Sequence, residues 1–168
     1  MSLPLDALAG AVRGAGLALG ADRCWLYARD PATRSGVALV RWLRAQDVHD
    51  VPEGVRVWST EPAELPARDP LLRRALHGVP ADAIGDVAAA EVDQELEHAL
   101  GHRAFVHVNL HVDGALWGVL QPGMTRAPRA WSAEDRGALL ALRPALAPLV
   151  VAALEGGSGR PASVRLVG

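Results

Sequence analysis

Residues 104–120 read AFVHVNLHVDGALWGVL, and this stretch decides the fold. Apolar residues alternate with mostly polar ones on both sides of Asp113-Gly114, a dipeptide that favours a two-residue hairpin turn. The pattern therefore predicts two antiparallel strands joined by a tight turn. With two residues in the turn, opposed positions add up to the same number, so Val112 should face Ala115 and Leu110 should face Trp117.

This register divides the hairpin into two faces. The first face is uniformly apolar and carries Val106, Val108, Leu110, Val112, Trp117 and Val119. The second face is mixed and carries Phe105, His107, Asn109, His111, Leu116, Gly118 and Leu120. We expect helices to pack on the apolar face. The mixed face either lines a ligand pocket or is half solvated, and the second alternative applies best to His111 beside the turn.

Spacing predicts the other elements, and capping signals mark the starts of two helices. Asp69 with Pro70 precedes the helix at 71–76, and Ser132 with Asp135, an Asp-bearing form of the capping box, begins the last one. Helices are expected over 6–19, 71–76, 92–100 and 132–154, and further strands over 23–29, 37–43, 55–58 and 83–87. Pro144 and Pro148 should kink or split the last helix. The order predicts one α+β domain over residues 1–155, built on a mostly antiparallel sheet. Residues 156–168 begin with Gly-Gly-Ser-Gly and are predicted to form a flexible tail.

Composition narrows the classes of function. The chain has 168 residues, of which 50% are hydrophobic, and a net charge of −2. Nucleic acid and membrane are therefore not expected as partners. All 17 basic residues are arginine, which reflects coding bias in a GC-rich genome rather than function. Cys24 is the one cysteine, so a disulfide within the chain and a Cys-based metal cluster are excluded. No signal-peptide pattern opens the chain, and the cytoplasm is the expected location.

Three stretches, in the expected order and spacing, resemble GAF domains. They are ADRCWLY at residues 21–27 ahead of Asp30-Pro31, the hairpin with LWGVL at 116–120, and PRAWSAED at 128–135. The resemblance spans about residues 5–155. It implies a GAF/PAS-like central antiparallel sheet with the first and last helices on one face. It also implies a ligand pocket on the other face, roofed by the middle helices and loops. The implied role is ligand sensing in signalling proteins, often as dimers formed through the terminal helices.

The mixed face and the resemblance together give a set of candidate pocket residues. The hairpin contributes Phe105, His107, Asn109 and Gly118, although Gly118 could instead reflect close packing against a neighbour. In bilin-binding relatives a tyrosine at the matching position faces the pocket, so the resemblance implies Tyr27, and Trp25 shares its face. Trp42 and Trp58 are further candidates for the wall, and the roof is expected to supply His77, with Arg73, Arg74 and Asp82 as weaker candidates. The alternative is that the aromatic residues belong to the ordinary core and the charged ones are solvated.

Metal and covalent chemistry fit the sequence poorly. Gly101 interrupts the helix that would bring His98 and His102 together, and His107 and His111 lie about 13 Å apart along a strand. We therefore predict no metal site. The methionine sulfoxide reductases of the family need several cysteines, and covalent bilin attachment needs one in the middle segment; Cys24 meets neither need. We predict no enzymatic activity and leave the cofactor open.

The leading hypothesis is a non-enzymatic GAF sensor that binds an unidentified small molecule in intracellular signal transduction. It would act as a homodimer or through a separate signalling protein. A second hypothesis is a dimerisation module with a degenerate pocket, because residues 144–154 are apolar and free of arginine. A third is an enzyme that uses His107 and His111 as acid and base.

Overall fold

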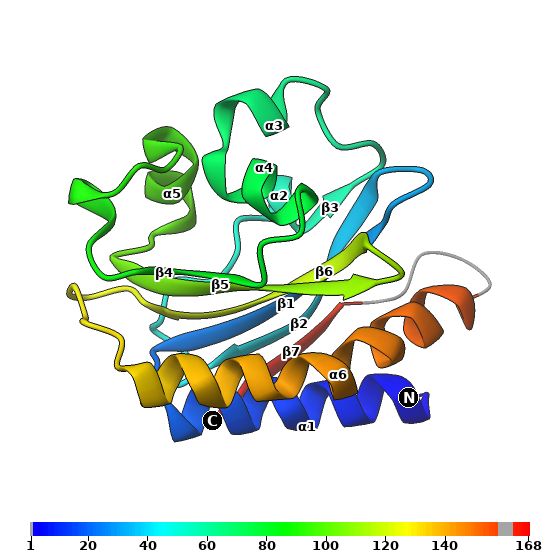
Figure 1. Cartoon of the computed structure of the whole chain (residues 1–168). Coiled ribbons are helices and arrows are strands. Elements are labelled where there is room, and N and C mark those ends of the chain that lie inside the picture. The colour runs from blue at the N-terminus through cyan, green and yellow to red at the C-terminus, as the bar shows by residue number, and fades with distance from the viewer. Residues whose placement is uncertain (1, 158–162) are drawn as a thin grey trace.

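A seven-stranded sheet forms the centre of the computed structural model, which describes residues 2–157 and 163–168 (Figure 1). The strands are β1 (Arg23–Asp30), β2 (Ser35–Leu43), β3 (Val57–Trp58), β4 (Ala81–Ile84), β5 (Ala104–Val112), β6 (Ala115–Met124) and β7 (Val164–Val167). Their order is β3-β2-β1-β6-β5-β4, with β7 also paired to β2. All pairs are antiparallel except β2 with β7. The predicted α+β fold with a central antiparallel sheet is confirmed.

Helices cover both faces of this sheet. They are α1 (Leu3–Ala18), α2 (Glu53–Arg56), α3 (Leu65–Arg68), α4 (Pro70–Leu76), α5 (Gln94–Leu100) and α6 (Ala133–Glu155), with a 3₁₀ turn at Val87–Ala89. In Figure 1, α1 and α6 lie side by side below the sheet, whereas α2 to α5 lie above it. The terminal helices therefore share one face, and the middle segment roofs the other, as the GAF resemblance implied.

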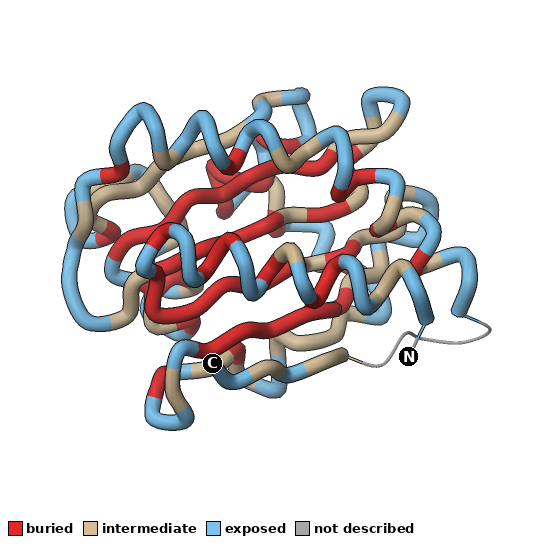
Figure 2. The backbone as a smooth tube through the Cα atoms, turned by 90° about the horizontal axis from the view of Figure 1, so that it is seen from below, coloured by how far each residue is buried: buried red, intermediate tan, exposed pale blue. Residues whose placement is uncertain are grey.

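The face beneath α1 and α6 holds the main hydrophobic core. Leu26, Val108 and Leu110 from the strands pack there with Leu8 from α1 and Val150 from α6. Figure 2, seen from the helix side, shows that buried residues follow the strands while the outer turns of the helices are exposed. Leu8 and Val12 of α1 are buried at helical spacing because only one side of the helix meets the sheet.

The β5–β6 hairpin confirms the predicted turn and corrects the predicted register. Asp113 and Gly114 both have positive φ, 50° and 78°, as a tight hairpin turn requires, and Val112 pairs with Ala115. A β-bulge then shifts the register, so that Leu110 pairs with Gly118 instead of Trp117. An extra residue on one strand reverses the faces of all later residues on that strand. Val119 therefore lies on the roofed face, and Leu120 lies in the core under the helices.

The C-terminal end of the chain differs from the prediction. Residues 158–162 of the expected tail lie outside the described residues, but Val164–Val167 form β7, in parallel register with Val40–Leu43. The segment alternates in burial, and Leu166 packs against the main core. Alternating apolar residues that can complete an exposed sheet edge favour pairing over a free tail. The Gly- and Ser-rich start of the segment concealed this strand.

Of the two effects predicted for Pro144 and Pro148, a kink or a split, the split is wrong, because α6 continues as one helix through both prolines. Both prolines are exposed, so the carbonyl groups they leave unpaired can bind water. A capping box between Ser132 and Asp135 begins the helix as the sequence indicated. With a mean hydropathy of 1.9 over an 18-residue window, α6 is long and apolar enough to cross a membrane. α6 packs against β5 and α1, and 28% of this apolar window is buried inside the domain.

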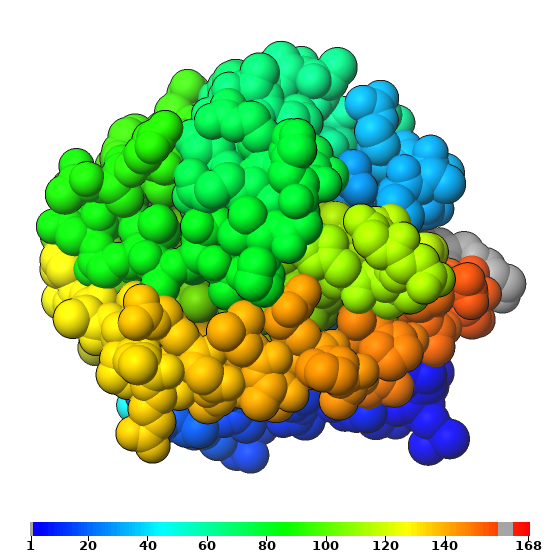
Figure 3. Space-filling model, in the orientation of Figure 1, coloured from blue at the N-terminus to red at the C-terminus, as the bar shows by residue number. Residues whose placement is uncertain are grey.

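The roof is fixed by short helices with defined ends. Asp69 caps α4 by accepting a hydrogen bond from the Leu71 amide (2.9 Å), and Pro70 occupies the first helical position, as predicted. Asp93 caps α5 in the same way, and Gly101 ends that helix in the left-handed conformation. The space-filling view shows this middle segment, in green, as a cover over the sheet (Figure 3).

Candidate functional site: a cavity beneath the roof

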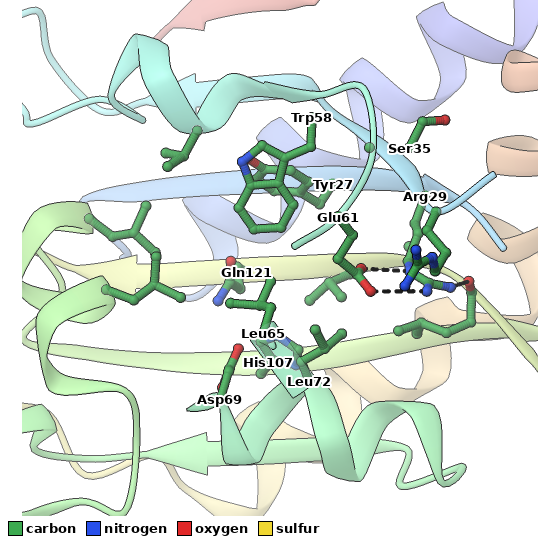
Figure 4. Close-up of a pocket in the computed structure, with 18 of the residues that line it drawn as sticks. Tyr27, Arg29, Ser35, Trp58, Glu61, Leu65, Asp69, Leu72, His107 and Gln121 are labelled. Atoms are coloured by element: carbon green, nitrogen blue, oxygen red, sulfur yellow. Dashed lines mark hydrogen bonds and ion pairs between the residues drawn. The ribbon is translucent and has the colours of Figure 1, made fainter. Parts of the chain in front are cut away.

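A cavity of about 110 Å³ lies between the sheet and the roof (Figure 4). Strands β1, β2 and β6 and residue His107 of β5 form its floor, and α3, α4 and α5 its ceiling. Its lining comprises Tyr27, Arg29, Arg34, Ser35, Gly36, Val55, Trp58, Glu61, Leu65, Asp69, Leu72, Leu96, Glu97, Leu100, His107, Leu116, Gly118, Val119 and Gln121. The cavity combines a largely apolar wall with a few polar groups, which is the usual character of a small-molecule site.

The apolar wall comes from both layers. Leu65 and Leu72 of the roof meet Leu116 and Val119 of β6. Tyr27 of β1 lies against Trp58, with their ring centroids 6.3 Å apart. These contacts bring side chains from the N-terminal third, the roof and β6 around one space. An apolar group of a ligand would be removed from water here.

One end of the cavity is closed by an ion pair between Arg29 and Glu61. The guanidinium donates to both carboxylate oxygens, at 2.9 and 3.2 Å, and reaches the Leu116 carbonyl at 3.4 Å. Glu61 is only 5% exposed, so this bidentate pair satisfies a carboxylate that burial would otherwise destabilise. The charges at this outer end therefore cancel within the protein.

The opposite, inner end gathers Asp69 and Glu97 from the roof with His107 and Gln121 from the sheet. In Figure 4 the labelled residues Asp69, His107 and Gln121 lie away from the Arg29–Glu61 pair. Burial, together with the nearby charge of Asp69, raises the pKa of Glu97 to about 8. Burial also raises the pKa of Asp69, although His107 opposes that shift. It lowers the pKa of His107, so this ring is neutral near pH 7.

A buried network behind the inner end positions Glu97. Its Oε2 lies 2.5 Å from Nδ1 of His102, whose ring stacks on Phe105 with centroids 4.4 Å apart. Arg23 lies over the ring of Trp25 at 3.9 Å and donates to the carbonyls of His49 (2.7 Å) and Leu100 (2.5 Å). Burial lowers the pKa of His102 well below its usual value. The pair is therefore a neutral imidazole beside a carboxyl that holds its proton, joined by a hydrogen bond.

Four of the nine candidate residues line the cavity, namely Tyr27, Trp58, His107 and Gly118. Gly118 does so only through its backbone, because a Cβ there would point at Val150 of α6 and lie 2.5 Å from the Tyr27 carbonyl oxygen. The bulge explains this correction, since it turns position 118 toward the helices. The close-packing alternative therefore describes Gly118. Whether the lining residues bind a ligand stays a prediction.

The other five candidates lie elsewhere. Trp42 packs in the main core against Gly16 of α1, because residue 42 faces the helices. His77 is exposed at the end of α4 and binds the Arg73 carbonyl (2.7 Å). Trp25 and Phe105 are fully buried around His102 behind the cavity. Asn109 also lies behind it and ties β5 to the loop before β4 through the Val79 carbonyl (2.8 Å).

The weaker roof candidates also lie outside the cavity lining. Arg74 pairs with Asp82 at 3.0 Å, and Arg73 lies on the exposed side of α4. His111 bridges two helices, with Nε2 2.7 Å from the Ala75 carbonyl and Nδ1 3.2 Å from Arg143. The structure therefore does not bring His107 and His111 together around the cavity as an acid–base pair. Within residues 2–157 and 163–168, no three His, Cys, Asp or Glu side chains form a group that could hold a metal ion.

Sequence reasoning missed most of the polar lining, namely Arg29, Glu61, Asp69, Glu97 and Gln121. Asp69 was recognised only as a helix cap, and a cap gives no sign of which cavity it borders. Glu97 shares the buried side of its short helix with Leu100, but it was not expected there because a carboxylate on a short helix is usually solvated. Gln121 was the one residue with a usable signal, because an amide ends the apolar run of β6. Val119 was missed because the bulge could not be predicted.

The fold is an α+β domain with a cavity beneath its roof, and a family comparison identifies its class. The GAF domain model matches residues 4–146, so the chain belongs to the GAF domain family. A search of the curated proteins found no match.

Solved structures of similar fold are photoreceptor domains. The blue-light-absorbing form of the Thermosynechococcus elongatus PixJ GAF domain is 19% identical, with a TM-score of 0.68 over 91% of this chain and 89% of that one. The phycoerythrobilin-bound GAF domain of a cyanobacterial phytochrome is also 19% identical, with a TM-score of 0.69 over 92% and 89%. GAF3 of Slr1393 from Synechocystis is 24% identical, with a TM-score of 0.62 over 90% and 97%. At these identities the likeness establishes the fold.

Proposed function

We propose that this chain is a non-enzymatic, cytoplasmic sensor domain that binds a small molecule without a covalent bond in the cavity beneath its roof. The observation that carries the proposal is the cavity itself, since an apolar wall meets convergent buried polar groups there. Binding would be reported to a second copy of the chain or to a separate signalling protein through α1 and α6. These two helices lie on the opposite face of the same sheet.

The size of the cavity limits the ligand. Sites for drug-sized ligands have volumes of about 300–1,000 Å³, whereas this cavity has about 110 Å³. The bilin bound by the phytochrome relative is an open-chain tetrapyrrole, which needs far more room than this. Cys24 is buried in the core under the helices, so it offers no attachment point for a chromophore in the cavity. The volume supports a ligand much smaller than a bilin, and the position of Cys24 supports non-covalent binding.

Native mass spectrometry of the freshly purified domain tests this proposal. We expect a non-covalent adduct on the unaltered chain and its loss in Val119→Phe, which fills the cavity from β6. Val167→Phe makes the same change on β7, outside the cavity, and should keep the adduct. The proposal fails if the chain carries no adduct and no small metabolite raises its melting temperature, because a ligand of the folded state must stabilise it.

One observation favours the alternative of a dimerisation module with a degenerate pocket. In the apolar window of α6 only 28% of the residues are buried, so much of its surface is available to a second copy. The exposed residues of α6 include Ala141, Ala145 and Ala152, which would allow close helix contact. Sedimentation at rising concentration tests this alternative. Dimers that Ala145→Glu dissociates, in a chain without adduct, would favour it, whereas a monomer at all concentrations would exclude it.

A further inference from the structure

The charges that line the cavity are distributed unevenly between its two ends. At the outer end Arg29 is bound by both oxygens of Glu61, and Arg34 is an exposed side chain. At the inner end Asp69 and Glu97 bring two carboxyl groups, and within the described chain neither forms an ion pair with an arginine. Arg23, the nearest guanidinium behind Glu97, donates instead to two backbone carbonyls. Within the described chain, neither carboxyl group at the inner end therefore has a cation within ion-pair distance, although the charge of Arg23 lowers the pKa of Glu97 from farther away.

A second, independent feature of the inner end also points to a ligand. Gln121 lines the cavity, is only 7% exposed, and its side-chain amide forms no hydrogen bond within residues 2–157 and 163–168 (Figure 4). Burial of a polar atom without a partner costs free energy, so such atoms usually indicate a missing ligand or water.

We propose that the cavity binds a small organic cation, a protonated primary amine on a short branched or cyclic apolar group. The ammonium would lie between Asp69 and Glu97, within reach of the Gln121 carbonyl oxygen. The apolar group would pack against Leu65, Leu72 and Leu116. This inference rests on the proposed function and specifies the class of ligand for the same site.

The chemistry of an ammonium matches these groups. It has three donors and no acceptor, and carboxylates together with an amide oxygen offer acceptors only. Burial raises the pKa of both Asp69 and Glu97, so a cation between them would restore their ionised forms. An anion would instead have to displace Glu61 from Arg29, and a neutral molecule would leave the pKa values of Asp69 and Glu97 raised.

The volume of the cavity sets the size of the apolar group. An apolar cavity of about 150 Å³ accommodates benzene, so 110 Å³ takes a group slightly smaller than benzene. Isobutylammonium meets this limit and is therefore the probe of choice. Isobutanol has nearly the same shape without the charge, and isobutyrate has nearly the same shape with the opposite charge.

Isothermal titration calorimetry of the full chain with these three probes, at pH 7.5, tests the proposal. We expect isobutylammonium to bind at least tenfold more tightly than isobutanol, and isobutyrate not to bind. Asp69→Asn, which keeps the helix cap, and Glu97→Gln should each weaken isobutylammonium binding at least tenfold. Glu95→Gln, an exposed carboxylate on the same helix as Glu97, is the matched control and should leave binding unchanged.

The proposal is overturned if isobutanol or isobutyrate binds as tightly as isobutylammonium, or if isobutylammonium does not bind to the unaltered chain. Equal binding by the Asp69 and Glu97 variants would overturn it as well. These outcomes leave the sensor function standing if native mass spectrometry still finds an adduct that Val119→Phe removes. The sensor function itself fails only if the unaltered chain carries no adduct and no small metabolite raises its melting temperature.

Discussion

The two faces of the sheet differ in what fills them. Under α1 and α6 one continuous cluster of apolar side chains joins the strands to both helices. Under the roof the apolar residues form three smaller clusters, separated by buried polar groups and by the cavity. Arg23, Glu97, His102 and His107 are all buried on this second side. The same strands therefore have a dry face and a polar face.

This difference separates stability from binding. A continuous apolar core gains free energy from burial alone and needs no ligand. The roofed face has partly desolvated charges and empty volume, both of which reduce stability and both of which a ligand could relieve. Substitutions should therefore reduce folding stability most on the helix face, and change binding or pH response most on the roofed face.

The largest expected effect comes from the same truncation made on both faces. Leu110→Ala, in the core under the helices, should lower the free energy of unfolding by about 3–4 kcal/mol. Leu116→Ala, beside the cavity, should lower it by about 2 kcal/mol, because its neighbours already lack contacts on one side. Urea unfolding followed by tryptophan fluorescence measures both. An equal or reversed order would contradict the distinction between the two faces.

A smaller effect is expected at Gly118, which lies at the closest approach of β6 to β1. A Cβ there would lie 2.5 Å from the Tyr27 carbonyl oxygen, and the backbone cannot move aside easily. Gly118→Ala should therefore cost about 2–3 kcal/mol by overpacking. Gly36 is the matched control, because a Cβ there would meet the Ala28 carbonyl oxygen at an ordinary 3.5 Å. Gly36→Ala should stay within about 0.5 kcal/mol in the same unfolding experiment, and a cost equal to that at Gly118 would show that the close approach is not the cause.

Gly118 also shows how far sequence reasoning could go. Alternation around Asp113-Gly114 predicted the hairpin, its turn and the pairing of Val112 with Ala115, because these depend on local chemistry. The faces of β5 followed correctly. The faces of β6 did not, because a bulge costs little and leaves no mark in the pattern of residue types. One extra residue thus placed Val119 in the cavity lining and Leu120 in the core.

The candidate site was harder to predict than the fold, for a physical reason. The fold follows from periodic burial, which repeats along many residues and survives single exceptions. The cavity depends on where short roof helices bring isolated polar residues such as Asp69, Glu97 and Gln121, and no periodicity records that. Trp42 shows the opposite error, because it was expected in the pocket wall and lies in the main core. An aromatic residue on a strand fits either face until the register is known.

The smallest expected effect is the pH response of the roofed face, and it depends on Glu97. Charged or titratable groups that act on this carboxyl are Arg23, Asp69, Asp93 and His102. In the folded state the pKa of Glu97 is about 8, whereas in an unfolded chain it is about 4.3. Unfolding at neutral pH therefore releases a proton, and stability must fall as pH rises. The stabilising contribution is fully present below about pH 4.3 and is lost above about pH 8.

The window from pH 6.5 to 8 isolates this effect. Below about pH 6.5 the lowered pKa values of His102 and His107 reverse the trend, because the unfolded histidines bind protons that the folded ones do not. Inside the window the free energy of unfolding should fall by about 1 kcal/mol per pH unit. Glu97→Gln should remove most of that slope, and the exposed Glu95→Gln should keep it. Two results would contradict this expectation: a free energy of unfolding of the unaltered chain that does not change with pH, or the same slope in both variants. Either result would mean that the protein itself already stabilises the charged groups under the roof, without a ligand.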